Sequence, residues 1–426
     1  MWWKRGVSQQ RLFDGTLAHM KLAVTGFVSG TAGSIASANA LLLRELLALG
    51  WEVDFFSKST FVDPRQAVGE DPKFRFVDVR NAAADCARRK LAAIPLAGFL
   101  ASRADSFTYN RLLVSNISRA HLERNYDLCL WLGDYARGRI PSLPNCSFAQ
   151  GPPGTDARSI LRHAAMIKRL SGPWRTARLQ LLAKMRLSRA GLPPFRHSDH
   201  VIVGSSQSRK TLAALYRIDN SSSLPYPIDL ELFRPGIKRV SGSTFRCLWL
   251  GRIIPRKRLD LLLDAADMLI RSGMDIELTI VGTPALVPQL ACLIEAFPHK
   301  GRLRWIKLLP RDQVPSLMAE SDVLIQPSEE EDFGSSVAEA QACGLPVIVG
   351  HTNGNKDYLS DRDICLPEDS IGELALAIRT LAGHSAKTGE GISLSRRTAE
   401  KYFDKRTIGG QLALTLKRCV KAAAQL

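Results

Sequence analysis

The chain has 426 residues, enough for two domains, and its 45% hydrophobic and 23% charged residues exclude a largely disordered protein. A formal net charge of +17 predicts an anionic partner, which could be nucleic acid, an acidic membrane surface or a polyanionic substrate. The eight cysteines form no C-x-x-C pair, so neither a disulfide framework nor a zinc site is indicated.

The first residues carry no recognisable targeting signal. Trp2, Trp3, Lys4 and Arg5 are followed by no apolar segment of a secretory signal, so we interpret residues 1–19 as an N-terminal extension. The longest apolar run, 91–101, is about half of the roughly 20 residues that a membrane span needs. We therefore expect a cytoplasmic protein, either free or peripheral on the inner face of the membrane.

Strand and helix signals alternate through the first half of the chain. A strand is predicted at 21–27, followed by a turn with Gly30 and Gly33 and a helix over 34–49, whose apolar residues share one face. Gly50 is placed to end that helix. Further strands are predicted at 51–56, 74–79, 127–132 and 201–203.

The second half gives a cleaner alternation. Strands are predicted at 245–250, 276–281, 303–306, 323–326 and 347–349, with a helix from about 259 that ends at Gly273. The segment 225–242, which contains three prolines, is interpreted as the link between two domains. This pattern predicts an α/β protein with two Rossmann-like domains that face each other across a cleft.

A basic loop follows the predicted strand 245–250. Gly251 allows the backbone to approach a ligand, and Arg252 and Lys257 supply the positive charge that a diphosphate needs. In a parallel sheet this loop lies at the carboxyl edge, where ligands bind. Taken alone, a solvated basic loop is the commoner outcome.

A second segment, E-D-F-G-S-S-V-A-E-A at 331–340, follows the strand at 323–326. If a helix begins near Gly334, its free N–H groups form an anion site beside Glu331, whose carboxylate can accept hydrogen bonds from sugar hydroxyls. Glu339, eight positions further on, can reach a ribose. The alternative is that the four acids at 329–332 only neutralise the start of a helix. We favour this alternative less, because the acidic segment and the basic loop occur together in one chain.

These two segments, with A-C-G-L-P-V-I at 342–348, resemble the large group of retaining glycosyltransferases with the two-domain GT-B fold, often called family 4. The resemblance is strong over 245–349 and weaker at 203–208 and 227–235. It implies an acceptor domain at 20–235, a nucleotide-sugar donor domain at 243–390, and a helical segment at 391–426 that packs back toward the first domain.

The resemblance also assigns roles to residues. Arg252 and Lys257 would hold the donor diphosphate and Glu331 would act on the donor sugar, so these three are the predicted catalytic residues. Predicted substrate-binding positions are Gly30, Gly33, Gly251, Phe333, Gly334, Ser335 and Glu339. Leaving-group stabilisation by fixed cations would be the main catalytic effect, with neither a metal nor a side-chain base required.

The chain departs from the family pattern beside the sugar. Asp332 stands where the family usually has a glycine, and Ser335 stands where it usually has an aliphatic residue. These two differences leave the identity of the donor sugar open. Many members also carry a histidine in the first domain, but the corresponding segment 148–154 has none, and Gln150 is a candidate substitute. His121 and His163 are alternatives that we interpret as ordinary surface or core histidines.

Two short patterns are typical of metal sites but occur often by chance. Asp361 and Asp363 form a D-x-D pair downstream of the donor segments, and His197 and His200 are three positions apart. We expect no metal at either place, because a site would need further ligands.

The basic charge is concentrated between 158 and 196. This segment has ten lysines and arginines and no acidic residue, with leucines and Trp174 interleaved. A basic amphipathic helix of this kind binds anionic membranes, whereas the alternative is a solvated helical face. Nucleic-acid binding ranks last because no nucleic-acid fold signature accompanies the charge.

The predicted function is retaining transfer of a sugar from a nucleotide diphosphate donor to a glycan or lipid-linked acceptor, in cell-surface polysaccharide synthesis. One alternative is a catalytically silent relative that acts as an adaptor on a membrane surface. Another is a nucleotide-sugar epimerase of the same fold. The sugar, nucleotide, linkage and oligomeric state are left open by the sequence.

Overall fold

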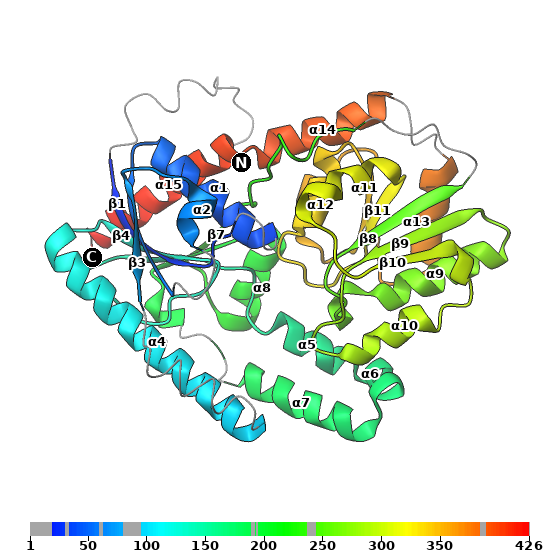
Figure 1. Cartoon of the computed structure of the whole chain (residues 1–426), viewed down its shortest axis with the longest axis horizontal. Coiled ribbons are helices and arrows are strands. Elements are labelled where there is room, and N and C mark those ends of the chain that lie inside the picture. The colour runs from blue at the N-terminus through cyan, green and yellow to red at the C-terminus, as the bar shows by residue number, and fades with distance from the viewer. Residues whose placement is uncertain are drawn as a thin grey trace. The chain divides into compact units, whose positions relative to one another are not determined.

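The computed structural model describes residues 19–29, 34–58, 63–79, 95–188, 192, 195–236, 244–383 and 389–425. The chain divides into two compact units, each built on a parallel sheet. Unit 1 comprises residues 1–149, 194–202 and 405–426, and unit 2 comprises 150–193 and 203–404. Figure 1 labels most elements of both units.

The first sheet confirms the predicted strands and adds two. Its order is β3 (Phe74–Asp78), β2 (Glu52–Ser57), β1 (Lys21–Gly26), β4 (Leu128–Leu132), β5 (Asn145–Phe148), β6 (His200–Val203) and β7 (Ser221–Ser223). Val24 lies opposite Phe55 on one side and Leu130 on the other, in parallel register. Both faces of β4 are buried, as expected for a central parallel strand.

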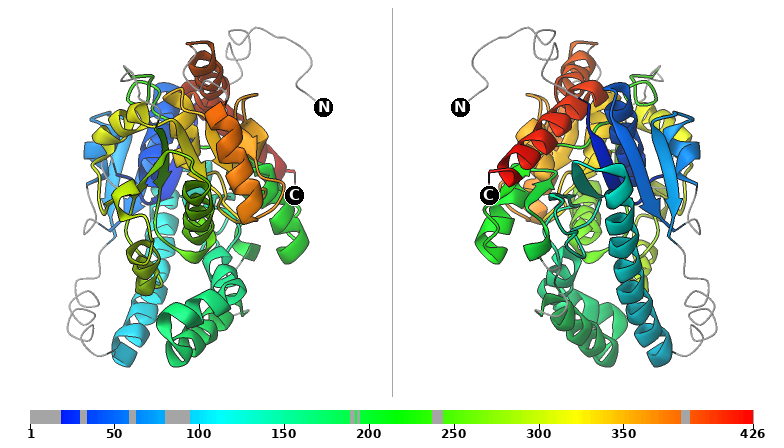
Figure 2. Two further views of the ribbon diagram at one scale, coloured as in Figure 1. Left: turned by 90° about the vertical axis from the view of Figure 1, so that its right-hand side faces the viewer. Right: turned by 90° about the vertical axis from the view of Figure 1, so that its left-hand side faces the viewer.

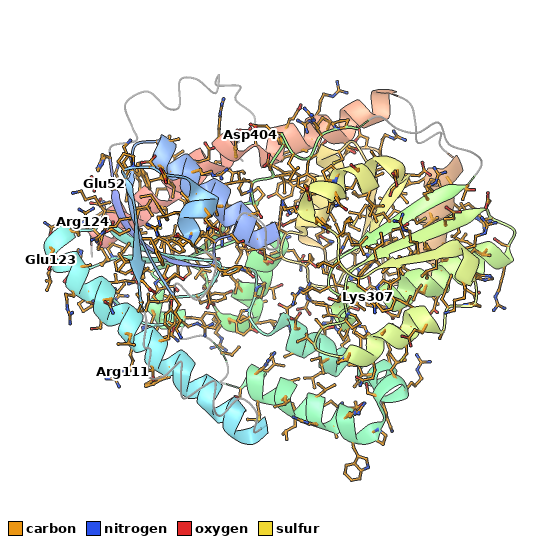
Figure 3. All side chains as sticks on the ribbon, in the orientation of Figure 1. Glu52, Arg111, Glu123, Arg124, Lys307 and Asp404 are labelled. Atoms are coloured by element: carbon orange, nitrogen blue, oxygen red, sulfur yellow. The ribbon has the colours of Figure 1, made fainter. Side chains whose placement is uncertain are left out.

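Four described α-helices belong to unit 1. They are α1 (Ser34–Ala48), α2 (Pro64–Val68), α4 (Pro95–Arg124) and α15 (Lys405–Ala423). The C-terminal helix α15 packs on α1, where a Cβ atom at Gly409 would overlap the Glu45 side chain; Figure 2 shows it in red beside the blue elements. At the end of α4, Arg124 pairs with Glu52 of β2 at 3.3 Å (Figure 3).

The second sheet confirms all five strands predicted for it. Its order is β10 (Leu303–Ile306), β9 (Ile276–Val281), β8 (Phe245–Leu250), β11 (Val323–Gln326), β12 (Val347–Val349) and β13 (Ile364–Cys365). The chain moves outward from β8 to β9 and β10, then returns to pair β11 with the other side of β8. The strand order therefore reverses between β8 and β11, which is where ligands bind in open α/β sheets.

Helices of unit 2 include the predicted one after Lys257. Those that follow strands of the second sheet are α9 (Leu259–Arg271), α10 (Ala291–Glu295), α11 (Val314–Glu320), α12 (Ser335–Ala342), α13 (Ile371–Gly383) and α14 (Gly389–Phe403), and α8 (Ser206–Tyr216) follows β6. Short 3₁₀ turns join several of them. In α9, Leu262, Ala266 and Leu269 are buried, which explains its regular apolar spacing.

Three further helices, α5 (Thr155–Arg162), α6 (Ala164–Ser171) and α7 (Pro173–Leu187), also belong to unit 2. Ile160 and Ile167 share one hydrophobic cluster with Leu262 of α9 and Leu290. The predicted first domain extended to residue 235, whereas the compact units place both 150–193 and 203–235 in unit 2. The shared core joins the first of these segments to the second sheet.

Candidate active site

The two predicted donor segments meet at the carboxyl edge of β8 and β11. The first is the loop 251–258 between β8 and α9, and the second is the loop 327–334 between β11 and α12. Their strands are neighbours in the second sheet, and Figure 1 labels β8, β11 and α12 close together. The structure thus places them at the reversal in strand order, the position expected of a ligand site.

The two predicted cations of the basic loop, Arg252 and Lys257, differ in exposure. Arg252 is exposed, whereas Lys257 is buried at the end of a 3₁₀ turn, Pro255–Lys257. Arg258, the next residue, has φ 49 and ends this turn in the left-handed region, which is unusual for a non-glycine residue. Its side chain pairs with Glu329 at 2.9 Å.

Lys257 joins the two loops. Its Nζ lies 2.6 Å from Oε2 of Glu331 and donates to Oε1 of Gln326 at 3.2 Å. Burial lowers the pKa of Lys257, and the carboxylate of Glu331 opposes that effect. The ammonium therefore depends on an anionic partner, which Glu331 provides in this structure.

Glu331 is held between two cations. Arg256 Nη1 contacts the same Oε2 atom at 2.7 Å, and Arg256 Nε in turn binds Asp156 of α5 at 2.7 Å. Burial by itself would raise the pKa of Glu331, but Arg256 and Lys257 together hold it at about 2. Glu331 is thus an oriented, ionised acceptor at neutral pH.

The shape of the loop after Glu331 depends on the segment that follows β12. Gly334 has φ 74 and begins α12 without a side-chain cap, and Asn355 Nδ2 donates to its carbonyl oxygen at 2.8 Å. The N–H of Gly354 donates to the carbonyl oxygen of Glu331 at 2.9 Å. Ser335, at the first position of α12, is buried. The N-terminal turn of this eight-residue helix is therefore fixed in direction.

The buried side chain of Phe333 anchors the 327–334 loop. Its ring is 1% exposed and lies edge-on to Phe403 at 5.2 Å and to Tyr226 at 5.6 Å. The side chain of this predicted substrate-binding residue thus belongs to an aromatic cluster, which leaves its backbone as the part available to a ligand.

Glu339 lies on the second turn of α12 and is 3% exposed. Arg311, from the segment after β10, pairs with it at 2.8 Å and also lies over the ring of Phe233 at 4.9 Å. Burial raises the pKa of Glu339, and Arg311 opposes that effect. One carboxylate oxygen, Oε1, contacts Arg311.

Asp332, the unusual residue beside the predicted sugar position, binds the start of α8. The N–H of Gly204 donates to both of its carboxylate oxygens, at 3.0 and 3.1 Å. A Cβ atom on Gly151 would lie 2.8 Å from Cβ of Asp332. The segment around exposed Gln150, which the resemblance related to the histidine-bearing region, therefore adjoins this aspartate.

Asp332 should make stability depend on pH. Burial raises its pKa from 3.8 to about 7, although Ser208 and Gly204 favour the carboxylate. The folded protein then keeps a proton that the unfolded chain has released, so the free energy of unfolding falls as pH rises from about 4 to about 7. Asp332→Asn should remove this fall, which amounts to at most about 4 kcal/mol.

The measurement is urea unfolding of wild type and Asp332→Asn at several pH values in that window. The stability difference should grow with pH and level off above about pH 7. Exposed Asp361→Asn is the matched control. A difference between Asp332→Asn and wild type that is independent of pH would contradict the assignment.

The remaining acids of the 329–332 run pair with α5 and its neighbour. Glu330 Oε2 lies 2.6 Å from Arg158, and Glu329 lies 2.5 Å from Arg162 and 3.0 Å from His163. Burial raises the pKa of Glu329, but His163 and Arg162 outweigh it and hold the pKa at about 2. Both Glu329 and Glu330 therefore serve to attach α5 to the site loop rather than to cap α12.

Other candidate residues have structural partners or lie elsewhere. Gly30 and Gly33 are outside the described residues. His121 stacks on Tyr126 and accepts its N–H. Asp363 accepts bonds from Gln341, Ser360 and the N–H of Val347, so it is a structural carboxylate. Within the described ranges, no cluster of three or more His, Cys, Asp or Glu residues could hold a metal.

Sequence reasoning missed several residues that position the site: Arg256, Gln326, Arg311, Asn353 and Asn355. Gln326 is the last residue of β11, and its Nε2 donates to the carbonyl of Leu250 while its Oε1 receives Lys257. Gln326 could have been identified in the sequence, because it is a polar residue at the end of a buried apolar strand. Arg311 had no such signal, because it lies in an unremarkable loop and contacts Glu339 only in the folded chain.

A family model described as glycosyl transferases group 1 matches residues 238–388. This part of the chain therefore resembles a group 1 domain. It contains both loops of the site, from Gly251 to Glu339. None of the described helices is long and apolar enough to cross a bilayer.

Curated relatives match part of this chain at modest identity. A D-inositol 3-phosphate glycosyltransferase from Catenulispora acidiphila is 29% identical over 182 residues, which cover 38% of this chain and 43% of that protein. Its counterpart from Mycolicibacterium smegmatis is 29% identical over 219 residues, or 48% of each chain. The matches thus span about half or less of these relatives' length.

Solved structures share the fold across both units. Anabaena HepE in complex with UDP and glucose aligns with a TM-score of 0.61 and 19% identity, covering 94% of this chain and 100% of that one. Sucrose-phosphate synthase from Thermosynechococcus elongatus gives 0.65 and 16%, covering 95% and 100%. These are GT-B glycosyltransferase structures, and the predicted fold of two Rossmann-like domains is confirmed.

Proposed function

We propose that this chain is a retaining glycosyltransferase that moves a sugar from a nucleotide diphosphate donor to a glycan or lipid-linked acceptor. A role in cell-surface polysaccharide synthesis is part of the proposal. The observation that carries it is the meeting of Lys257 and Glu331 at 2.6 Å, at the reversal in strand order of the group 1 domain. The ammonium of Lys257 can bind a diphosphate, and the carboxylate of Glu331 can accept hydrogen bonds from sugar hydroxyls.

The cations of the 251–258 loop form the diphosphate site of this proposal. Arg252 is exposed and close enough to lower the pKa of Lys257 through its charge. When a diphosphate arrives, Lys257 exchanges Glu331 for a phosphate oxygen, while Arg256 continues to hold Glu331. The carboxylate is then paired before and after donor binding, which keeps it oriented toward the sugar.

Fixed positive charge would provide most of the rate acceleration. As the bond between the sugar and the diphosphate breaks, negative charge develops on the leaving phosphate, and Arg252 and Lys257 stabilise it. The same phosphate takes the proton of the acceptor hydroxyl, so the scheme requires neither a side-chain base nor a metal. The backbone amides near Gly334 and Ser335 would contact the sugar and phosphate.

Neighbouring structures support a nucleotide donor. Anabaena HepE was solved with UDP and also with UDP-glucose, and a further neighbour, WaaG, is described as a glycosyltransferase of lipopolysaccharide biosynthesis. Their TM-scores of 0.59 to 0.61 indicate that they share the fold of this chain. We therefore begin the tests with uridine nucleotides.

Isothermal titration with UDP, GDP, ADP and inorganic diphosphate tests the site. Lys257→Ala should weaken both UDP and inorganic diphosphate, because both present phosphate oxygens. Glu339→Gln should weaken UDP about tenfold, the value of a charged hydrogen bond, but leave inorganic diphosphate unchanged because that ligand has no ribose. Equal effects of Glu339→Gln on both ligands would contradict the ribose role.

Incubation with UDP-sugars then separates the alternatives. Transfer or slow hydrolysis that releases a sugar of the donor's own anomeric configuration supports the retaining enzyme. Conversion of one UDP-sugar into its epimer, without release of UDP, would identify an epimerase. Absence of binding to any nucleotide, together with tight binding to anionic vesicles, would identify the adaptor.

A further inference from the structure

Helix α7 exposes apolar side chains that the core does not use. Trp174 is 87% exposed, Leu181 60% and Met185 44%. Because these residues are spaced by seven and four positions, they lie on one face of the helix, with Arg178 between them. Leu182, beside this row, is 36% exposed. We call Trp174, Arg178, Leu181, Leu182 and Met185 the α7 face.

The opposite side of α7 is fixed to unit 2. Thr176 and Ala183 are buried, and Leu179 and Leu187 pack against the hydrophobic cluster of α9 and the second sheet. The α7 face therefore points away from its own core, and the helix cannot rotate to bury it without losing these contacts. Figure 1 shows α7 beside α5 and α6, on the side of them away from β8.

Cations flank the α7 face on both sides. Arg175, Lys184 and Arg186 are exposed, and together with Arg178 they have no ion pair among the described residues. This distinguishes them from Arg158 and Arg162 of α5, which are neutralised by Glu330 and Glu329. No acidic residue occurs in the sequence between Asp156 and Asp199. Four exposed cations of the segment without an ion pair among the described residues thus lie on α7.

We propose that the α7 face docks on an anionic lipid bilayer, with Trp174, Leu181 and Met185 in the interface and the four cations on lipid headgroups. An apolar row flanked by cations is the pattern of a helix that lies in the plane of a membrane surface. Tryptophan is favoured at the headgroup level. A nucleic-acid site would place cations, not an apolar row, at the centre of the face. This surface is separate from the proposed donor site.

Vesicle flotation of the full chain tests the proposal, with phosphatidylcholine alone or with one third phosphatidylglycerol. Wild type should float with the anionic vesicles and stay behind with the neutral ones. The variant Arg175→Gln/Arg186→Gln should bind the anionic vesicles more than about tenfold more weakly, since each cation contributes about fivefold. Trp174→Ala/Leu181→Ala should weaken binding by a similar factor through loss of buried apolar area.

A matched control removes one apolar residue and one cation elsewhere in unit 2. Leu308 is 85% exposed and adjoins exposed Lys307, which Figure 3 labels. Leu308→Ala/Lys307→Gln should float as wild type does. Titration with UDP shows whether each variant keeps its donor site, so a failure here is distinguishable from a failure of the proposed enzyme. Equal flotation of wild type and both α7 variants, or binding of wild type to duplex RNA in preference to anionic vesicles, would overturn the proposal.

Discussion

Lys257→Ala is expected to reduce kcat/KM for turnover of the preferred nucleotide sugar by about a thousandfold. The lysine is a buried cation of the site, and its ammonium lies 2.6 Å from Glu331 and 3.2 Å from Gln326. Charge that develops on a leaving diphosphate in this low-dielectric position is stabilised more strongly than it would be in water. Release of UDP from the nucleotide sugar, followed over a range of donor concentrations, measures the effect.

The same variant should keep its stability. Glu331 remains paired with Arg256 at 2.7 Å when the lysine is gone, so no buried carboxylate is left without a cation. We expect the free energy of unfolding to change by less than about 1 kcal/mol, because burial already disfavours the charged lysine. Lys307→Ala, at an exposed lysine of unit 2, is the control. A loss of turnover below about tenfold, in a folded Lys257→Ala protein, would rule out the catalytic role.

Gly354→Ala is expected to destabilise the protein by about 3 kcal/mol and to abolish nucleotide binding. A Cβ atom at this position would overlap the carbonyl oxygen of Asp332, and it would lie 2.6 Å from Oγ of Ser205. Because the clash is with backbone, it cannot be relieved by a side-chain rotation. The 331–334 loop must shift, and Glu331 would then move away from Lys257.

Gly372→Ala provides the comparison. This glycine lies in α13, and a Cβ atom there would meet nothing within 4 Å. Alanine in an open helical position should be neutral or stabilising by up to about 1 kcal/mol. Urea unfolding and titration with UDP measure both variants. Wild-type affinity for UDP in Gly354→Ala would show that the site tolerates a displaced loop, contrary to this expectation.

The fold and the place of the candidate site could be predicted from the sequence because both follow from patterns among residues that are close together in the chain. The five predicted strands of the second sheet are short runs rich in apolar residues, and the apolar spacing of α9 follows the helical repeat. The segments that contain Lys257 and Glu331 follow two such strands directly, so their meeting at one edge follows from parallel pairing. The strands β5, β7 and β13 were not predicted, because runs such as N-C-S-F lack the β-branched residues that mark a strand.

Only the tertiary structure decided which charges pair. Arg256 and Glu331 are 75 positions apart, and Arg158 and Glu330 are 172 apart, so no local pattern connects them. From the sequence, neutralisation of a helix start by the acids at 329–332 was the less favoured alternative, and the cations after 158 could form either a basic amphipathic helix or a solvated helical face. Folding joins the two sets through α5 and leaves unpaired charge on α7.

The sequence by itself determined the α/β class, the two-sheet architecture and the segments of the site. Strand runs, helical spacing and turn residues act over a few neighbours, and that is enough to specify these features. The orientation of Glu331, the engagement of Asp332 with Gly204 and the exposure of the α7 face depended on the tertiary structure. They arise from contacts between distant segments, whose energies depend on burial and distance that a linear pattern does not contain.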